Sequence, residues 1–376
     1  MHDALSLSPV PGAGLGIVAT APIPPSTRIA FAPHTVLLNL TTLARFSPAT
    51  AATAAAAAAL GPALTAHTQL ALALLDACAA PAHPWRDWLA TLPRSFASLP
   101  LHWPPAPCTL LPPSALQLLV AMQARFAADW AAARSAQPAL DEARFRWAWS
   151  AVNTRSLYYP AARPNDRMTL CPFIDYFNHT TAAFSGDAVA TCTVDLTRRG
   201  YTVTTPPAAA PPSRTGPTRA GEQLLVSYGS HCGDFLLVEY GFVPSSDGGG
   251  DYVRLDAWMI PRLSAAGATE EVLQRRGYWG DYAVDARAGC CFRSATAARV
   301  ACAAAGCHGD ERRWLDGVLE GVEHDAAQAL ALLSGEKQTD EESEHASARP
   351  MVAARWAQIA RIVRAARALG AAEATD

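Results

Sequence analysis

The side chains that could do chemistry stand in three short stretches of the sequence. The first is an apolar run, residues 170–177, that ends in Asn178 and His179. The second ends in Tyr228 and the third in Tyr240, and a glycine follows each tyrosine. Polar groups at the edge of a core need hydrogen-bond partners, so each ending must lie beside other polar atoms. Taken singly, an Asn-His pair is more often a turn, and a tyrosine is more often a half-buried core residue. Only an ordered set of such stretches indicates a site.

Two upstream stretches extend this set. Residues 12–16 read Gly-Ala-Gly-Leu-Gly and lead into the apolar residues 17–19. They lack the Gly-x-Gly-x-x-Gly spacing and the following helix of a dinucleotide site. Arg155 stands just before Tyr158 and Tyr159. In this order the stretches resemble the SET-domain protein lysine methyltransferases. The likeness is to the branch with a helical insertion, typified by the Rubisco large-subunit methyltransferase and related ribosomal-protein methyltransferases.

The resemblance implies a role for each candidate residue. The cofactor would be S-adenosyl-L-methionine, and the acceptor would be a lysine side chain of a protein substrate. Tyr228 would be the catalytic residue, with its hydroxyl beside the methyl group and the amine. Tyr240 and Phe242 would line the lysine channel, and Asp175 would be a supporting acid. The residues implied in cofactor binding, among which Arg155 would pair with the cofactor carboxylate, are Gly14, Leu15, Gly16, Arg155, Asn178 and His179.

Methyl transfer to a lysine makes particular demands on such a site. The reaction is an in-line displacement, so donor and acceptor must be held within near-attack distance. The amine must also be neutral, although a free lysine has a pKa of about 10.4. Desolvation in an apolar channel, next to a positive sulfur, lowers that pKa and lets the proton leave to water. No strong base is needed, so a tyrosine among aromatic walls and carbonyl oxygens is sufficient.

Departures from the family pattern leave a second hypothesis open. Ala13 stands where the family often has glutamate and Gly233 where it usually has asparagine, and the proline-rich residues 206–217 look inserted where the family usually has a short turn. Leu157, where the family often has phenylalanine, is a further departure. The alternative to an enzyme is therefore a catalytically silent SET-fold module that binds a partner protein. One relative in this branch modifies histidine, so a histidine acceptor is also open. A hydrolase based on Cys171 or His179 has little support, because no nucleophile elbow with a matching base is present.

Composition argues against several other classes of protein. The 376 residues carry a net charge of −3, so no basic field attracts nucleic acid or an anionic membrane. The N-terminus has no signal-peptide pattern, and the alanine-rich run 49–60 is too short to span a bilayer. Nine cysteines fit reduced thiols better than a disulfide framework. We expect a monomeric protein of the cytoplasm or nucleus.

No metal site is expected from the cysteines. Five residues of ligand type gather in the last third of the chain, but they lack the Cys-x-x-Cys spacing of a zinc module. These residues are Cys290, Cys291, Cys302, Cys307 and His308. Many SET enzymes carry a zinc cluster after the domain, whereas the branch that this chain resembles does not.

The elements that would position the candidate residues form four expected segments. Residues 1–40 would be the N-terminal half of an α+β SET domain of small curved sheets, and 41–147 would be a helical insertion. Residues 148–245 would be the C-terminal half, with the cofactor and lysine site, and the resemblance implies a pseudoknot there. Residues 246–376 would form a mostly helical domain that, in the family, helps to hold the protein substrate.

Patterns within these segments predict particular elements. We expect strands near residues 16–19, 27–31 and 35–39, and a hairpin that joins 191–196 to 200–205. A helix that begins at Trp147 would carry Arg155, and the tryptophans of the insertion would pack in its core.

The last helix should bury one face, and three stretches should be surface loops or joints. The face is formed by Val352, Trp356, Ile359 and Val363, and the solvated arginines off it are Arg361, Arg364 and Arg367. The loops are 206–217 and 336–344, and the joint is 245–250.

Overall fold

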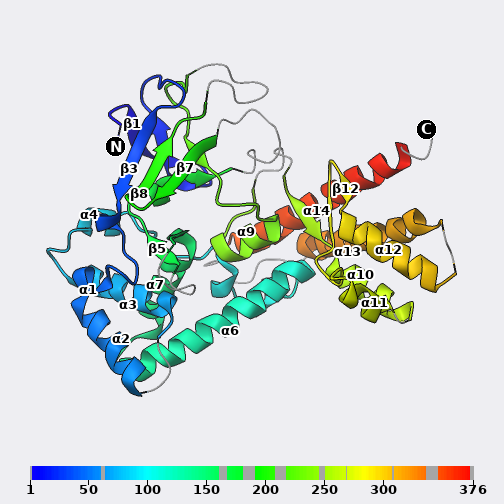
Figure 1. Ribbon diagram of the computed structural model, residues 1–376, viewed down its shortest axis with the longest axis horizontal. Coiled ribbons are helices and arrows are strands. Elements are labelled where there is room, and N and C mark those ends of the chain that lie inside the picture. Colours follow the sequence, from blue (N-terminus) through cyan, green and yellow to red (C-terminus); the bar gives the residue numbers. More distant parts are fainter. Residues whose placement is uncertain are drawn as a thin grey trace. The chain divides into compact units, whose positions relative to one another are not determined.

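A computed structural model shows a mixture of helices and small sheets, which confirms the α+β fold class (Figure 1). The structure describes residues 2–60, 64–160, 167–180, 191–207, 217–244, 250–267, 269–306, 309–335 and 346–372. The chain forms two compact units. The first contains Met1–Phe96 and Ala121–Gly229, and the second contains Ala97–Val120 and Ser230–Asp376. The four expected segments divide the chain at other positions and stay a prediction.

The first unit opens with a hairpin that contains the glycine-rich turn. β1 (Leu5–Val10) pairs with β2 (Gly14–Ala19) in antiparallel register, with Val10 opposite Gly14. Gly12 and Gly14 both have a φ of +73°, a left-handed conformation that glycine adopts without strain. The strand expected at 16–19 is confirmed as the second arm of this tight hairpin.

A five-stranded sheet, in the order β3-β8-β7-β9-β6, holds the ends of the motif stretches. Its antiparallel strands are β3 (Arg28–Pro33), β7 (Thr191–Thr197) and β8 (Gly200–Thr204), and the expected β7–β8 hairpin is confirmed. β9 (Leu225–Val226) runs parallel to both of its neighbours, β7 and β6 (Asn178–His179). β9 therefore brings the segment before Tyr228 next to the Asn-His pair.

Residues 35–39 do not form the expected strand. A short 3-10 turn, η1 (His34–Val36), follows β3, and Leu38 then makes an isolated antiparallel bridge with Leu170. Leu38 is 1% exposed, so the apolar pattern reflects burial of an extended segment that lacks a continuous partner strand. The bridge joins this segment to β5 (Met168–Leu170), which pairs with β4 (Ser156–Tyr158).

Helices fill the rest of the first unit, as the expected insertion requires. They are α1 (Leu43–Phe46), α2 (Pro48–Leu60), α3 (Ala66–Ala79), α4 (Arg86–Leu89) and α7 (Glu142–Arg155), while α6 (Pro113–Ala136) has residues in both units. α3 packs against α7, where the buried Trp149 stacks on His67 with 4.0 Å between ring centroids. α7 begins earlier than expected, behind the N-cap Asp141, and its last residue is Arg155.

The second unit is mainly helical, as expected, but it also contains a small sheet that sequence patterns did not predict. Its helical elements are η2 (Pro100–His102), α5 (Pro105–Cys108), α9 (Gly233–Tyr240), α10 (Asp256–Ala265), α11 (Thr269–Arg275), α12 (Phe292–Ala304), α13 (Glu311–Gly335) and α14 (Ala348–Ala372). The sheet consists of β10 (Tyr252–Arg254), β11 (Ala283–Asp285) and β12 (Gly289–Cys290). Strands this short carry no periodic signal.

The last helix, α14, buries the face that its sequence predicts. The four residues of this face are at most 4% exposed: Val352, Trp356, Ile359 and Val363. Arg361 and Arg364 are exposed, as expected, whereas Arg367 is half-buried and pairs with Glu320 and Glu323 of α13 at 2.7 and 2.5 Å. A further arginine of α14, Arg355, is fully buried.

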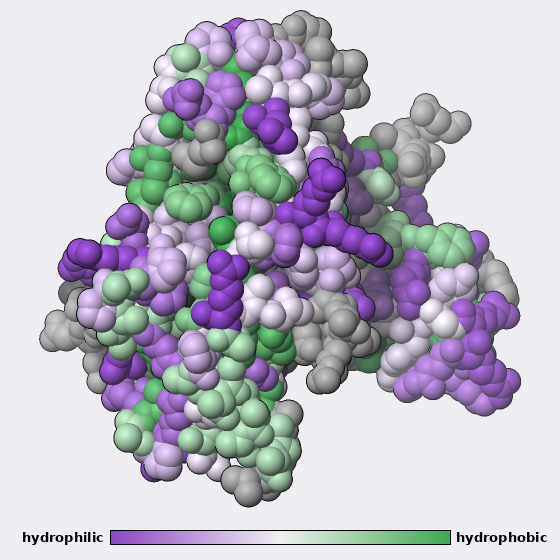
Figure 2. Space-filling model, turned by 60° about the vertical axis from the view of Figure 1, so that its left-hand side comes forward, coloured by the Kyte–Doolittle hydropathy of each residue, from purple (hydrophilic) through white to green (hydrophobic). Residues whose placement is uncertain are grey.

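The surface of the first unit is partly apolar where its helices are rich in alanine. Figure 2 shows a pale green area in the lower part of the molecule, where Figure 1 places α2. Across the described ranges, no helix is long and apolar enough to cross a membrane. Most of the predicted loops and the joint, residues 208–216, 245–249 and 336–344, lie outside the described residues.

Candidate functional site

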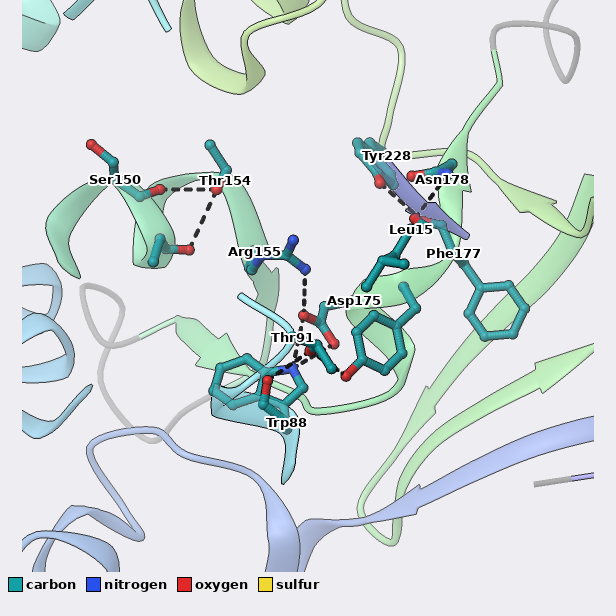
Figure 3. A network of polar contacts seen from close by, with 12 residues as sticks. Leu15, Trp88, Thr91, Ser150, Thr154, Arg155, Asp175, Phe177, Asn178 and Tyr228 are labelled. Atoms are coloured by element: carbon teal, nitrogen blue, oxygen red, sulfur yellow. Dashed lines mark hydrogen bonds and ion pairs between the residues drawn. The ribbon is translucent and has the colours of Figure 1, made fainter. Parts of the chain in front are cut away.

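The glycine-rich turn lies against Asn178. The Asn178 side-chain amide donates a hydrogen bond to the Leu15 carbonyl oxygen at 3.2 Å (Figure 3). A Cβ atom on Gly16 would lie 2.8 Å from Nδ2 of Asn178 and 2.6 Å from Nε2 of Gln223, so only glycine fits there without a shift. Gly14 supplies the left-handed turn at the start of the strand. The structure thus brings four predicted cofactor residues together.

Tyr228 lies beside His179. The Tyr228 backbone N–H donates to Nδ1 of His179 at 3.1 Å, and the two ring centroids are 5.1 Å apart. Nδ1 therefore acts as an acceptor, which places the proton of a neutral imidazole on Nε2. The Tyr228 hydroxyl donates to the Phe177 carbonyl oxygen at 2.9 Å. These bonds hold both ends of the tyrosine, so its hydroxyl oxygen presents its lone pairs at a defined position.

Arg155 is held by a buried carboxylate. Its Nη1 atom lies 2.8 Å from Oδ2 of Asp175, whose side chain is 1% exposed. Trp88, from α4, donates its indole N–H to both oxygens of the same carboxylate, at 3.0 and 3.1 Å (Figure 3). Asp175 therefore has the supporting place that the resemblance implies, because it fixes the direction of the guanidinium.

The electrostatics of this pair leave Arg155 able to bind an anion. Burial raises the pKa of the Asp175 carboxyl above its ordinary value, and the Arg155 guanidinium and the Trp88 N–H oppose that shift. The Arg155 side chain is 18% exposed, and its Nε atom is buried without a hydrogen-bond partner among the described residues. A guanidinium has five N–H donors, so donors remain after the contact with Asp175.

These features fit the cofactor that the resemblance implies. The buried Nε–H of Arg155, which has no partner within the described part of the chain, suits the cofactor carboxylate, and the two would form a charge-assisted hydrogen bond. The glycine at position 16 keeps the turn close to the amides of Asn178 and Gln223, so backbone atoms of the turn can approach a ligand. S-adenosylmethionine would be held by Arg155, by the turn and by the Asn-His pair.

The two predicted channel residues, Tyr240 and Phe242, belong to the second unit. α9 ends at Tyr240, and Gly241 follows in the left-handed conformation with a φ of +76°. A Cβ on Gly241 would lie 2.7 Å from the Ser98 hydroxyl oxygen, so this turn requires glycine. The rings of Tyr240 and Phe242 lie 6.3 Å apart between centroids, and burial raises the pKa of Tyr240. Their approach to Tyr228 stays a prediction.

Two residues of the first unit were missed by sequence reasoning. Trp88 holds the Asp175 carboxylate, and Gln223 places a buried amide beside Gly16. Trp88 was assigned to packing because a tryptophan in a helical region is usually a core residue. Gln223 lies within the Gly-Glu-Gln stretch before Tyr228, but only the three-dimensional pairing of Val18 with Gln223 shows that its side chain meets the turn.

A cavity of about 350 Å³ lies elsewhere in the first unit and contains none of the candidate residues. Its walls are Thr35, Val36, Arg45, Phe46, His83, Pro84, Trp85, Pro172 and Phe173. Phe173 has a φ of +76° and is 54% exposed. Among the described residues, no group of three or more His, Cys, Asp or Glu side chains could hold a metal ion. Cys307 and His308 lie outside those residues.

Sequence comparisons find SET-domain proteins. The ribosomal lysine N-methyltransferase set11 of Schizosaccharomyces pombe is 26% identical over 298 residues, which cover 75% of this chain and 66% of that protein. SET domain-containing protein 4 of Mus musculus is 26% identical over 264 residues, or 62% of this chain and 53% of that protein. The chain thus spans about half to two thirds of these relatives. No protein-family model matches the chain.

Structural comparisons find the fold of solved LSMT structures. The SET domain of LSMT bound to lysine and AdoHcy has a TM-score of 0.58 and 14% identity, with 99% of this chain and 87% of that chain covered. Rubisco LSMT bound to AdoMet gives the same TM-score and identity, over 98% of this chain and 87% of that chain. The chain therefore has the SET-domain LSMT fold, and the resemblance to the SET-domain lysine methyltransferases of this branch is confirmed.

Proposed function

We propose that this protein is a protein-lysine N-methyltransferase that uses S-adenosyl-L-methionine and acts on a protein other than a histone. The resemblance of the motif residues supports this proposal, and so do the relatives. One of them is named as a ribosomal lysine methyltransferase, and the structural neighbours contain AdoMet, AdoHcy, lysine or methyllysine.

The observation that carries the proposal is the meeting of three distant stretches in one unit. Leu15 accepts a hydrogen bond from Asn178, and Tyr228 is bonded to both Phe177 and His179. A silent fold would need neither the close approach of the turn at Gly16 nor a buried guanidinium N–H that has no partner among the described residues. The first unit thus contains both the residues proposed to bind the cofactor and the tyrosine proposed to contact the acceptor amine.

Each residue of the chain has a distinct task in the proposed reaction. S-adenosylmethionine supplies, when bound, a methyl group on a positively charged sulfur. Arg155 would hold the cofactor carboxylate, and Asp175 would keep the guanidinium in place. The Tyr228 hydroxyl donates a hydrogen bond to the Phe177 carbonyl oxygen, so the hydroxyl oxygen can accept an N–H of the incoming amine and orient it. Apolar surroundings would lower the pKa of the lysine ammonium, so that it releases its proton to water and becomes the neutral amine.

The substrate class and the partners are part of the proposal. We infer that the acceptor is a lysine of a ribosomal or other cytosolic protein, with histidine as the other open acceptor. Tyr240 and Phe242 would line the entry for that side chain, and residues 246–376 would help to hold the substrate protein. We propose a monomer that resides in the cytoplasm or nucleus and makes no direct contact with nucleic acid.

Calorimetric titration with S-adenosylmethionine tests the donor site. We expect micromolar binding by the wild-type protein and loss of that binding, by at least tenfold, in Arg155→Ala. Arg144 is an exposed arginine of the same helix, so Arg144→Ala is the matched control and should bind like the wild type. Absence of saturable binding to the wild type would favour the silent protein-interaction module instead.

Transfer is then measured with cofactor that carries a tritiated methyl group and with protein extracted from purified yeast ribosomes. We expect one protein band to carry the tritium. After acid hydrolysis of that band, the tritium should be recovered as methyllysine. Label in methylhistidine would change the acceptor but keep the donor site. Cofactor binding without transfer to ribosomal or other cellular protein would leave a binding module and contradict the enzyme.

A further inference from the structure

A buried ion-pair cluster in the second unit joins the last helix to the start of α9. Arg355 of α14 is 0% exposed, and its Nε donates to Oδ1 of Asp234 at 2.6 Å. Its Nη1 contacts Oδ2 of Asp251 and donates to Oε1 of Gln358 at 2.7 Å. Burial alone would lower the pKa of Arg355, but Asp234 and Asp251 raise it above its ordinary value, so the guanidinium stays charged.

Gly233 is the residue that gives this guanidinium its space. A Cβ on Gly233 would lie 2.2 Å from Nη1 and 2.7 Å from Cζ of Arg355. Both distances are far below a normal van der Waals contact. The Arg355 guanidinium is bound by two carboxylates and an amide, so moving it aside would cost much free energy. The Arg355 guanidinium thus occupies the place where a side chain at residue 233 would begin.

The same cluster caps the N-terminus of α9. The N-cap residue, Cys232, makes no side-chain cap, and the N–H of Gly233 donates instead to Oδ1 of Asp251 at 2.7 Å. Asp234 lies in the first turn, where a carboxylate interacts favourably with the helix dipole. Arg355 therefore binds both acids on which the start of this helix depends.

The other end of α9 carries the proposed channel residues. The helix extends from Gly233 to Tyr240, a rise of about 10 Å. At its end Gly241 turns the chain, and the Phe242 N–H donates to the Leu236 carbonyl oxygen at 3.5 Å. Because α9 has only about two turns, we expect a displacement of its start to be transmitted to the two aromatic rings at its end.

We propose that Arg355 is a positioning residue: from α14 it fixes the start of α9 and thereby the orientation of Tyr240 and Phe242 at its end. Gly233 is thus the counterpart of Arg355, because only a residue without a Cβ atom leaves room for the guanidinium. This inference rests on the proposed lysine methyltransferase activity, in which Tyr240 and Phe242 receive the acceptor side chain.

The first test compares Arg355→Lys with Arg361→Lys, an exposed arginine of the same helix. Lysine keeps the charge but cannot bond both acids through a planar fork. We expect Arg355→Lys to bind S-adenosylmethionine within about twofold of the wild type. Methyl transfer to ribosomal protein should fall at least tenfold, and the amides of residues 233–242 should exchange with deuterium at least tenfold faster. Arg361→Lys should match the wild type in all three measurements.

A folded Arg355→Lys protein with unchanged exchange in α9 and unchanged transfer would overturn the inference. A uniform rise in exchange across the whole second unit would overturn it as well, because it would indicate a purely structural role. If the wild-type protein transferred no methyl group to any substrate, the proposed function would be refuted instead. Amide hydrogen exchange in α9 would still report whether Arg355 holds this helix.

The second test is a rescue that does not depend on either single variant being fully stable. Gly233→Ala should speed exchange in α9 because the new methyl group collides with Nη1 of Arg355. In the double variant Gly233→Ala, Arg355→Lys, the lysine side chain lacks the guanidinium atoms Cζ and Nη1 and so leaves room for that methyl group. We expect exchange in α9 and the transfer rate of the double variant to recover several-fold relative to Gly233→Ala alone. Additive losses would show that the two residues do not depend on each other, and would overturn the inference.

Discussion

Oδ2 of Asp175 lies 2.8 Å from Nη1 of Arg155, and the Asp175 side chain is 1% exposed while that of Arg155 is 18% exposed. One partner of this ion pair is thus withdrawn from water, and the other faces both the acid and a place where a ligand can reach it. In the proposed function, Asp175 would stabilise the structure and Arg155 would bind the ligand. The two roles can be separated by mutation.

Asp175→Asn should affect both stability and cofactor affinity. The amide keeps the shape of the side chain but leaves the Arg155 charge without its partner, which costs about 3 kcal/mol in the free energy of unfolding. Because the guanidinium loses its orientation, we expect affinity for S-adenosylmethionine to fall about tenfold. Urea unfolding and calorimetric titration measure the two effects. Asp87→Asn, an exposed acid of α4, is the control and should change neither.

Gly16→Ala should reduce cofactor affinity by at least tenfold. The new Cβ would press on the amides of Asn178 and Gln223, at 2.8 and 2.6 Å, and so displace the turn. Gly12→Ala is the matched control: its φ of +73° costs about 1 kcal/mol with a side chain, but its Cβ would meet nothing within 4 Å. Equal affinities for the cofactor in both variants would show that crowding at residue 16 is unimportant for the donor site.

Tyr228→Phe should separate binding from transfer. The variant loses the hydroxyl that donates to Phe177 but keeps the ring beside His179. We expect the transfer rate to fall about 100-fold, while the affinity for S-adenosylmethionine changes less than threefold. Tyr158→Phe serves as the control because Tyr158 is 59% exposed. An unaltered rate in Tyr228→Phe with cofactor bound would remove the catalytic role of this tyrosine.

Stability should decrease in acid because of His67. Burial lowers the pKa of His67 from 6.5 to about 4, so the unfolded chain takes up a proton that the folded protein excludes. The free energy of unfolding therefore falls as the pH drops through the window from 6.5 to about 4, by roughly 3 kcal/mol in all.

Thermal melts across this pH range measure the effect. In His67→Gln, whose amide cannot titrate, the melting temperature should depend less on pH over that window. The Nε2 atom of His67 donates to the Trp149 carbonyl oxygen at 2.8 Å, and the Gln amide can replace this donor. Identical pH profiles for the variant and the wild type would rule out His67 as the source.

The site was predictable where the chemistry lies in the motif itself. Gly16 and Asn178 lie within the short strands β2 and β6, and Tyr228 follows β9 by two residues, so the pairing of these strands brings the motif residues together. Trp88 was not predictable as a partner of Asp175, because a hydrogen bond between residues that far apart leaves no local pattern. The small β10–β12 sheet was missed for a related reason, since each strand has only two or three residues.

Arg355 shows a further limit of pattern reading. It stands next to Trp356 on α14, among arginines that a helical wheel assigns to solvent. Its burial depends on two acids from distant parts of the chain, Asp234 and Asp251. A buried charge is costly unless such partners exist, and the sequence alone does not show that they come together.

The place of β9 between β7 and β6 also determines when, during translation, the donor site can form. The turn at Leu15 leaves the ribosome early, but its partner Asn178 follows 163 residues later, and β9 and Tyr228 follow only after that. Until β9 is made, the edges of β6 and β7 that it will cover stay unpaired and open to wrong association. We therefore expect chaperones to bind a nascent chain that stalls before residue 225. Folding should also be slow, because the contacts of Asn178 with Leu15 and the pairing of β9 with β6 join residues far apart in the sequence.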